Sequence, residues 1–236
     1  MEECDMCGRF TLAIDADHAK TQLALGQMPL NWEARYNIAP SQEVATVPDS
    51  ITRDVVMMRW GLVPFWAKEP SIGYKMINAR AETVNEKPAY KNSFRHKRCL
   101  ILADGFYEWS QDTGRAKRAY FFSLKSREVF AFAGLWDDWE PKGVSSVPGI
   151  AGLTTCTIIT TTALAVVVPI HPRMPVILTG EATHAWLESG SLTELRSLLK
   201  PLDPKLLQAW EVSSAVNNLA NEGEALVKEV KRLNLD

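Results

Sequence analysis

Arg98-Cys99-Leu100-Ile101-Leu102-Ala103 leads directly into Asp104-Gly105-Phe106-Tyr107-Glu108-Trp109. The apolar run predicts a buried strand over residues 98–103, and this strand delivers the polar and aromatic residues at its end. Glu108 then stands among aromatic side chains. A carboxyl that is desolvated in this way has a raised pKa and can serve as a general acid or base. The alternative is a glutamate at an exposed strand position flanked by core aromatics.

Further short strands lie on both sides of this run, separated by turn residues. We expect strands over 9–14, 44–47, 55–58, 156–162, 175–178 and 206–212, and a hairpin of 120–124 with 129–135. Residues 35–42 have the composition of a turn-rich connection. Helical spacing predicts helices over 15–25, with Asp15 or Asp17 as N-cap, and over 88–96, 181–188, 192–199 and 222–233. Many short strands with few helices and no βαβ alternation predict an α+β fold, a single domain with a mainly antiparallel, barrel-like sheet core and peripheral helices.

The composition fits one soluble domain. The chain has 236 residues, of which 46% are hydrophobic and 23% charged, and a net charge of −2. No apolar run approaches the roughly 20 residues of a membrane span, and no signal peptide begins the chain, so we expect a cytoplasmic protein without a membrane partner. Residues 75–98 hold seven lysines and arginines against two glutamates, a local charge of +5. A solvated charged face is the simpler interpretation, and a phosphate-binding face is the alternative.

The cysteines predict neither disulfides nor a metal. Cys4 and Cys7 form a C-x-x-C pair, whereas Cys99 and Cys156 lie far away in the sequence. A structural zinc site needs a second pair of ligands, and a disulfide framework needs a secretory context. We therefore expect no metal and no cofactor.

Met6-Cys7-Gly8-Arg9-Phe10 contains a candidate nucleophile. If translation starts at Met6, or if residues 1–6 are removed, Cys7 carries a free α-amine next to its thiol. Unperturbed pKa values of roughly 7.7–8.0 and about 8.5 leave both groups partly active near neutral pH. Such an aminothiol condenses with aldehydes to a thiazolidine, which no internal cysteine can do. The alternative is a buried, inert cysteine.

Three further side chains could take part in chemistry. His171 lies between Pro172 and an apolar residue in a stiff loop, and histidine exchanges protons near neutral pH. Asn78 and Arg80 alternate in an extended segment and so share a face, with an amide that can orient a group and a guanidinium that can hold a phosphate. Ordinary loop chemistry is the alternative for each. Together with Cys7 and Glu108 they fit either a thiol hydrolase or a site for covalent aldehyde capture.

Six motifs in order carry a resemblance to a known family. They are residues 6–10 (MCGRF), 35–40 (RYNIAP), 60–64 (WGLVP), 77–83 (INARAET), 103–109 (ADGFYEW) and 171–175 (HPRMP). In this respect the chain resembles the SOS response-associated peptidase (SRAP) family, whose members process abasic sites. The resemblance runs from Cys7 to about Val216.

The resemblance implies a function and a role for each motif residue. The N-terminal cysteine would form a thiazolidine crosslink with an abasic site in single-stranded DNA, after self-cleavage exposes it, with possible crosslink reversal or lyase activity. Asn78 would orient the nucleophile or the sugar, Glu108 would act as acid and base, and His171 would assist ring opening and proton transfer. Arg9, Arg80 and Arg173 would hold phosphates of the DNA. Trp66 would provide an apolar contact to the bases beside the lesion. Stacking on aromatic surface suits single strands without sequence readout.

One departure from the family pattern lies at the start of the chain. Residues Met1 to Asp5 precede Met6, and Glu2 is too bulky for ordinary removal of the initiator methionine. We therefore expect residues 1–6 to be an extension, either a misassigned start or a removed segment, and residues 7–236 to form the SRAP-like domain. A monomer is expected. Two alternatives stay open: a cysteine peptidase or amidase that acts on other substrates, and a DNA-binding protein without chemistry.

Overall fold

A computed structural model describes residues 8–110, 117–141, 152–188 and 190–230. Its elements follow the chain in the order β1 (Phe10–Leu12), α1 (Ala16–Gln22), β2 (Arg35–Ile38), β3 (Glu43–Val47), β4 (Val56–Trp60), η1 (Pro70–Lys75), β5 (Asn78–Arg80), α2 (Lys91–His96), β6 (Arg98–Ala103), β7 (Gly105–Trp109), β8 (Ala119–Leu124), β9 (Phe130–Trp139), β10 (Leu153–Thr162), β11 (Arg173–Pro175), β12 (Ile177–Leu178), α3 (Glu181–Leu187), α4 (Leu192–Ser197), η2 (Pro204–Leu206), β13 (Leu207–Val212), η3 (Ser214–Asn217) and η4 (Glu224–Val227). The expected α+β class is confirmed.

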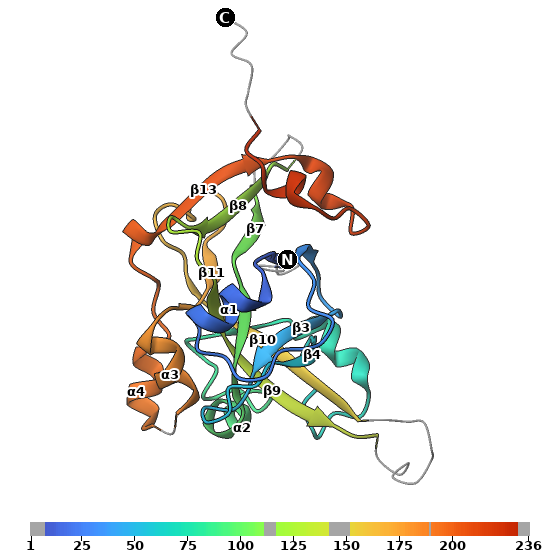
Figure 1. The fold of residues 1–236 in the computed structure, drawn as a ribbon. Helices are drawn as coiled ribbons and strands as arrows, with labels where there is room; N and C mark the ends of the chain where they lie inside the picture. Colours follow the sequence, from blue (N-terminus) through green and yellow to red (C-terminus); the bar gives the residue numbers. More distant parts are fainter. Residues whose placement is uncertain (1–7, 111–116, 142–151, 189, 231–236) are drawn as a thin grey trace, which may run out of the picture.

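Five strands close into a barrel. The larger sheet runs β11-β10-β4-β3-β6-β9-β12, and an additional β10–β9 pairing joins β10, β4, β3, β6 and β9 into a ring. All pairs are antiparallel except those of β10 with β4 and with the short β5, which are parallel. In Figure 1 these strands form the lower body of the molecule, with α3 and α4 beside it.

The second sheet has the order β13-β8-β7-β1-β2 and is antiparallel throughout. It stands above the barrel in Figure 1, and the chain passes into it from β6 to β7 at Asp104. Strands distant in sequence thus meet in it, because β1 pairs with β7 and β13 with β8. The residue that opens β1, Phe10, is fully buried.

The burial of β6 explains why the sequence predicts this strand so clearly. All six of its residues are buried, between β3 on one side and β9 on the other. A strand buried on both faces reads as a continuous apolar run rather than an alternation. Helix α1 also begins as expected, since the side chain of Asp15 accepts a hydrogen bond from the backbone N–H of His18 at 2.9 Å.

Three expectations about secondary structure are wrong. Residues 35–38 form strand β2, and only the following residues turn. Strands β8 and β9 do not pair as a hairpin but lie in different sheets, because β8 pairs with β7 and β13 while β9 pairs with β6, β10 and β12. In place of a helix over 222–233, the described part of this segment holds the 3-10 turn η4, and residues 231–233 lie outside the described residues.

A tight backbone contact closes the connection from β4 to β5. Gly61 has a φ of +129°, and a Cβ there would lie 2.7 Å from the carbonyl oxygen of Gly73. Only glycine fits this conformation and this approach. The backbone N–H of Leu62 donates to the carbonyl of Met76 at 3.1 Å, so both ends of segment 61–76 are fixed at the same place. We call residues 61–76 the aromatic loop, for the side chains it exposes.

Among the described helices, none is long and apolar enough to cross a membrane.

Candidate functional site

The strand that follows the candidate nucleophile lies beside the strand that carries Glu108. Phe10 of β1 pairs with Phe106 of β7, and the carbonyl of Arg9 accepts a hydrogen bond from the backbone N–H of Tyr107 at 3.0 Å. Glu108 is the next residue of β7 and is 4% exposed. The desolvation expected for this carboxyl therefore has its structural basis. Cys7 itself lies outside the described residues, and Gly8 is the first residue that the structure describes.

Arg9 is bound within the protein. Its Nη1 donates to Asn37 Oδ1 at 2.6 Å and to the carbonyl of Val216 at 2.8 Å. Its guanidinium also lies over the ring of Trp109, 5.6 Å from the centroid. These contacts tie β1 to residues 213–230, which we call the C-terminal strap.

Asn37 is the centre of that attachment. It is fully buried, and its Nδ2 donates to the carbonyls of Asn218 at 3.0 Å and Asn221 at 2.9 Å, with a longer contact to Val216. Because Asn37 Oδ1 also accepts from Arg9, one amide holds both the start of β1 and the strap. A buried amide with donors and acceptor engaged is a rigid anchor.

A second group of candidates gathers around β10. Asn78 and Arg80 of β5 are in register with Ile158 and Thr160, and Arg173 of β11 is opposite Thr162. The guanidinium of Arg173 donates to the carbonyl of Thr160 at 2.7 Å. One strand therefore brings together residues that are 95 positions apart in the sequence.

Arg173 is also engaged by a carboxylate. Its Nη1 and Nη2 donate to the two oxygens of Glu82 at 2.6 and 2.9 Å, a bidentate pair. The hydrogen bond from Arg173 is the largest cause that lowers the pKa of Glu82, and the charge of Arg80 also lowers it. Of the two arginines, Arg80 is exposed, whereas the Arg173 side chain is only 15% exposed.

His171 is buried at the start of this group. It is 4% exposed, and its Nδ1 lies 3.2 Å from both the backbone N–H and the carbonyl oxygen of Arg173. Burial lowers the pKa of His171, the charge of Arg173 lowers it further, and the backbone contact opposes them. The imidazole is thus neutral at pH 7, with its Nδ1 side fixed to the backbone, and it is able to accept a proton.

A buried tryptophan connects the two groups. The ring of Trp60 meets that of Phe10 edge to face, with centroids 5.2 Å apart, and its Nε1 donates to the carbonyl of Ile77 at 2.9 Å. Phe10 follows Arg9, and Ile77 precedes Asn78. Trp60 therefore contacts residues adjacent to both groups.

Trp66 lies on the aromatic loop, between β4 and β5. It is 41% exposed, and Phe65 and Tyr74 of the same loop are 56% and 61% exposed. These three are the exposed large aromatic side chains among the described residues. The sequence identified Trp66 but missed Phe65 and Tyr74. In such a segment, the sequence does not distinguish an exposed apolar side chain from a buried one.

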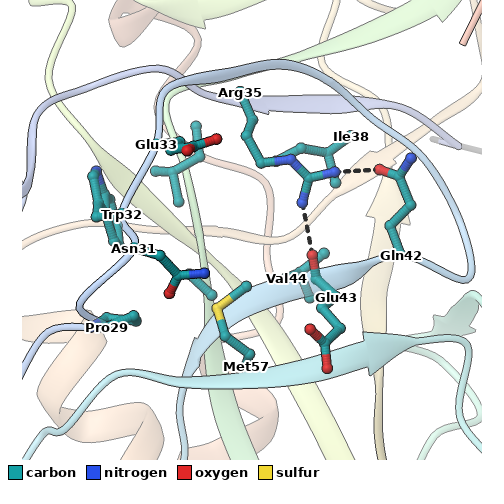
Figure 2. Close-up of a pocket in the computed structure, with 12 residues that line it drawn as sticks. Pro29, Asn31, Trp32, Glu33, Arg35, Ile38, Gln42, Glu43, Val44 and Met57 are labelled. Atoms are coloured by element: carbon teal, nitrogen blue, oxygen red, sulfur yellow. Dashed lines mark hydrogen bonds between the residues drawn. The ribbon is translucent and has the colours of Figure 1, made fainter. Parts of the chain in front are cut away.

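A pocket of about 490 Å³ is lined by residues of β1 and β2 and by Trp32 and Met57. Figure 2 shows Arg35 reaching toward Gln42 and the backbone of Glu43, and it donates hydrogen bonds to both. None of the candidate residues lines this pocket. Among the described residues there is also no cluster of three His, Cys, Asp or Glu side chains placed to hold a metal ion.

Comparison with known proteins decides the family. A model of the family described as SOS response associated peptidase (SRAP) matches residues 6–219. The chain belongs to the SRAP family. As the motifs predicted, the match spans nearly the whole chain and all the candidate residues.

Relatives of this SRAP chain are found in bacteria and eukaryotes. It is 43% identical to the abasic site processing protein YoqW of Bacillus subtilis (strain 168), over 94% of this chain and 99% of the relative. It is 35% identical to the abasic site processing protein HMCES of Xenopus tropicalis, over 73% and 56% of the two chains. A crystal structure of a Bacteroides thetaiotaomicron protein shares the fold with a TM-score of 0.83 and 26% identity, over 95% of this chain and all of that one.

Proposed function

We propose that this SRAP chain processes abasic sites in single-stranded DNA and forms a covalent crosslink to them through an N-terminal Cys7. The observation that carries the proposal is the similarity, along nearly the full length, to relatives described as abasic site processing proteins. An abasic site in its ring-opened form is an aldehyde that lacks a base. Chemistry selective for aldehydes therefore recognises the lesion without reading a sequence.

The crosslink forms in two steps. The α-amine of Cys7 adds to the aldehyde carbon, and one water leaves as the Schiff base forms. The thiol then adds across the C=N bond, its proton passes to the nitrogen, and a thiazolidine ring closes. A free amine is required, so we propose that hydrolysis of the Met6–Cys7 peptide bond removes residues 1–6 and leaves the SRAP domain of residues 7–236.

Glu108, His171 and Asn78 are proposed to move protons and to orient the reactants. The backbone N–H of Tyr107 donates to the carbonyl of Arg9, two residues after Cys7 in the sequence, and Glu108 is the residue after Tyr107. A buried carboxyl there suits acid and base catalysis in Schiff-base formation and in self-cleavage. The lowered pKa of His171 suits a neutral proton acceptor in ring opening and in crosslink reversal or lyase activity.

The surface around the aromatic loop supports binding of a single strand. Trp66, with Phe65 and Tyr74, offers exposed rings on which bases can stack, and Arg80 offers an exposed charge for phosphate. Arg173 is proposed to hold phosphate as well, in competition with its bidentate pair to Glu82. Arg9 contributes its positive charge from beneath the C-terminal strap.

A denaturing gel tests the proposal. Protein that begins at Cys7 is incubated with a single-stranded oligonucleotide that carries one abasic site, and a slower covalent band is expected. Protein that begins at Met1 with Cys7→Ala is the control for crosslinking and self-cleavage. The absence of a shifted band, or an equal band with Cys7→Ala, overturns the proposal. A product of strand incision on the same gel measures lyase activity.

A peptidase that acts in trans is the second candidate, and the description of the family as peptidases favours it. Cys7 would attack a peptide carbonyl, with His171 or Glu108 as base. Cleavage of a peptide library in the absence of DNA would support this candidate. Intact protein mass without any cleaved peptide contradicts it.

A further inference from the structure

Strand β5, which carries Asn78 and Arg80, is held by side chains as well as by its neighbour. It has three residues, and among the described strands it pairs with β10. Three successive backbone carbonyls accept side-chain hydrogen bonds. The carbonyl of Ile77 accepts from Trp60 Nε1 at 2.9 Å, that of Asn78 from the Tyr90 hydroxyl at 3.1 Å, and that of Ala79 from Thr160 Oγ1 at 3.4 Å.

Two of these donors come from outside the β5–β10 pair. Trp60 ends β4 and is fully buried, while Tyr90 precedes α2 and is 8% exposed. They therefore add two contacts to those that β10 makes: one at the carbonyl of Ile77, which Ile158 of β10 also contacts, and one at the carbonyl of Asn78. A three-residue strand has few backbone bonds of its own, so each added contact matters for its position.

Trp60 has a second contact that Tyr90 lacks. Its ring packs edge to face on Phe10, and Phe10 is paired with Phe106, two residues before Glu108. A single rigid side chain thus touches the strand that leads from Cys7 and bonds to the residue before Asn78. The spacing between β1 and β5 depends on this side chain.

We propose that Trp60 and Tyr90 are positioning residues that hold β5, and with it Asn78, in place for the crosslinking reaction. The inference rests on the proposed crosslinking reaction. Neither side chain reaches substrate, and both act through the backbone of β5. Because a misplacement of about 1 Å can slow a reaction about 100-fold, the loss of one such contact should be visible in the rate.

The test uses a matched pair of tryptophans. Trp60→Phe removes the donor to Ile77 and keeps an aromatic ring, and the backbone N–H of Ile158 still donates to that carbonyl at 3.1 Å. Trp186→Phe is the control, because Trp186 is equally buried and its Nε1 donates to the carbonyl of Cys99 at 3.0 Å, away from β5. The single-turnover rate of crosslinking is measured with protein that begins at Cys7, beside the melting temperature.

We expect Trp60→Phe to slow crosslinking by about 10- to 100-fold and Trp186→Phe to lower the melting temperature with a rate within twofold of the wild type. Tyr90→Phe deletes one hydroxyl and should slow crosslinking in the same direction, and it carries the test if Trp60→Phe does not fold. Equal rates for the Trp60 and Trp186 variants, or an unchanged rate for Tyr90→Phe, overturn the proposal. If the wild type itself forms no crosslink, the proposed function fails instead.

A double-mutant cycle separates positioning from general loosening. In an Asn78→Ala background, Trp60→Phe should cause no further loss, because its effect passes through Asn78. Wild type and Trp60→Phe should also form a thiazolidine with free butanal at equal rates, since a small aldehyde needs no alignment. Additive losses in the cycle, no effect of Asn78→Ala alone, or slowed reaction with butanal would each contradict a positioning role.

Discussion

Replacement of Glu82 by glutamine should tighten the binding of single-stranded DNA. Glu82 holds the guanidinium of Arg173 at 2.6 and 2.9 Å, so any phosphate at Arg173 competes with this carboxylate. Glutamine keeps the shape of the side chain and one acceptor oxygen but removes the charge. Arg173 stays in place, because the carbonyl of Thr160 still accepts from it.

The size of the effect follows from counterion release. One additional phosphate contact makes the slope of log K against log salt steeper by about 0.7 for a single strand. Between 50 and 200 mM salt this slope corresponds to a factor of about 2.6, so the gain in affinity should be about 2.6 times larger at the lower salt. The cost in folding stability should be small, about 0–1 kcal/mol, because the Glu82 carboxylate is half exposed.

Fluorescence anisotropy with an undamaged oligonucleotide over a salt series measures both quantities. Glu86→Gln is the matched control, since Glu86 is exposed, lies four residues further along and carries the same charge. An unchanged salt slope for Glu82→Gln, or an equal change for Glu86→Gln, would refute competition at Arg173 and leave only a general effect of net charge.

Three further predictions concern single side chains. Trp66→Ala should weaken binding of undamaged single-stranded DNA at least about fivefold, from a stacking loss of about 1 kcal/mol or more, and an unchanged Kd in anisotropy would contradict stacking there. Burial raises the pKa of Asp104, so its protonated form is favoured in the folded state, and stability is lost as the pH rises through that pKa. Asp104→Asn should flatten the dependence of the unfolding free energy on pH above about 4, the ordinary pKa of an aspartate, in urea titrations, and an identical slope would be the contrary result. Since burial lowers the pKa of His171, the ratio of wild-type to His171→Gln crosslinking rates should fall to half only below about pH 6.5, the ordinary value for histidine. A midpoint above this value would show a different titrating group.

The sequence predicted those strands whose signal is local. Strand β6 has the predicted bounds, because a run buried on both faces is apolar at every position. The hairpin of β8 with β9 was wrong, since the choice of partner strands depends on distant residues that no local pattern reveals. The predicted helix over 222–233 failed for a related reason. Its described part is bound by tertiary contacts, with Trp210 Nε1 donating to the carbonyl of Val227 at 2.8 Å.

The sequence singled out candidate residues one by one but did not indicate their arrangement. The motifs singled out Asn78, His171 and Arg173, yet nothing local indicates that β10 brings β5 and β11 together. The ion pair of Arg173 with Glu82 joins residues 91 positions apart, and no pattern of residue spacing in the sequence predicts it. The roles assigned to the site residues remain predictions.

The hydrogen bond from Arg9 to Val216 has a consequence for the timing of biosynthesis. Its partners are 207 residues apart in the chain. At about 5–20 residues per second, the ribosome adds Val216 about 10–40 s after Arg9. During that interval the newly made start of the polypeptide lacks the strap that holds Arg9 and Asn37. The residues around the proposed aminothiol of Cys7 are thus completed only when the chain is almost finished.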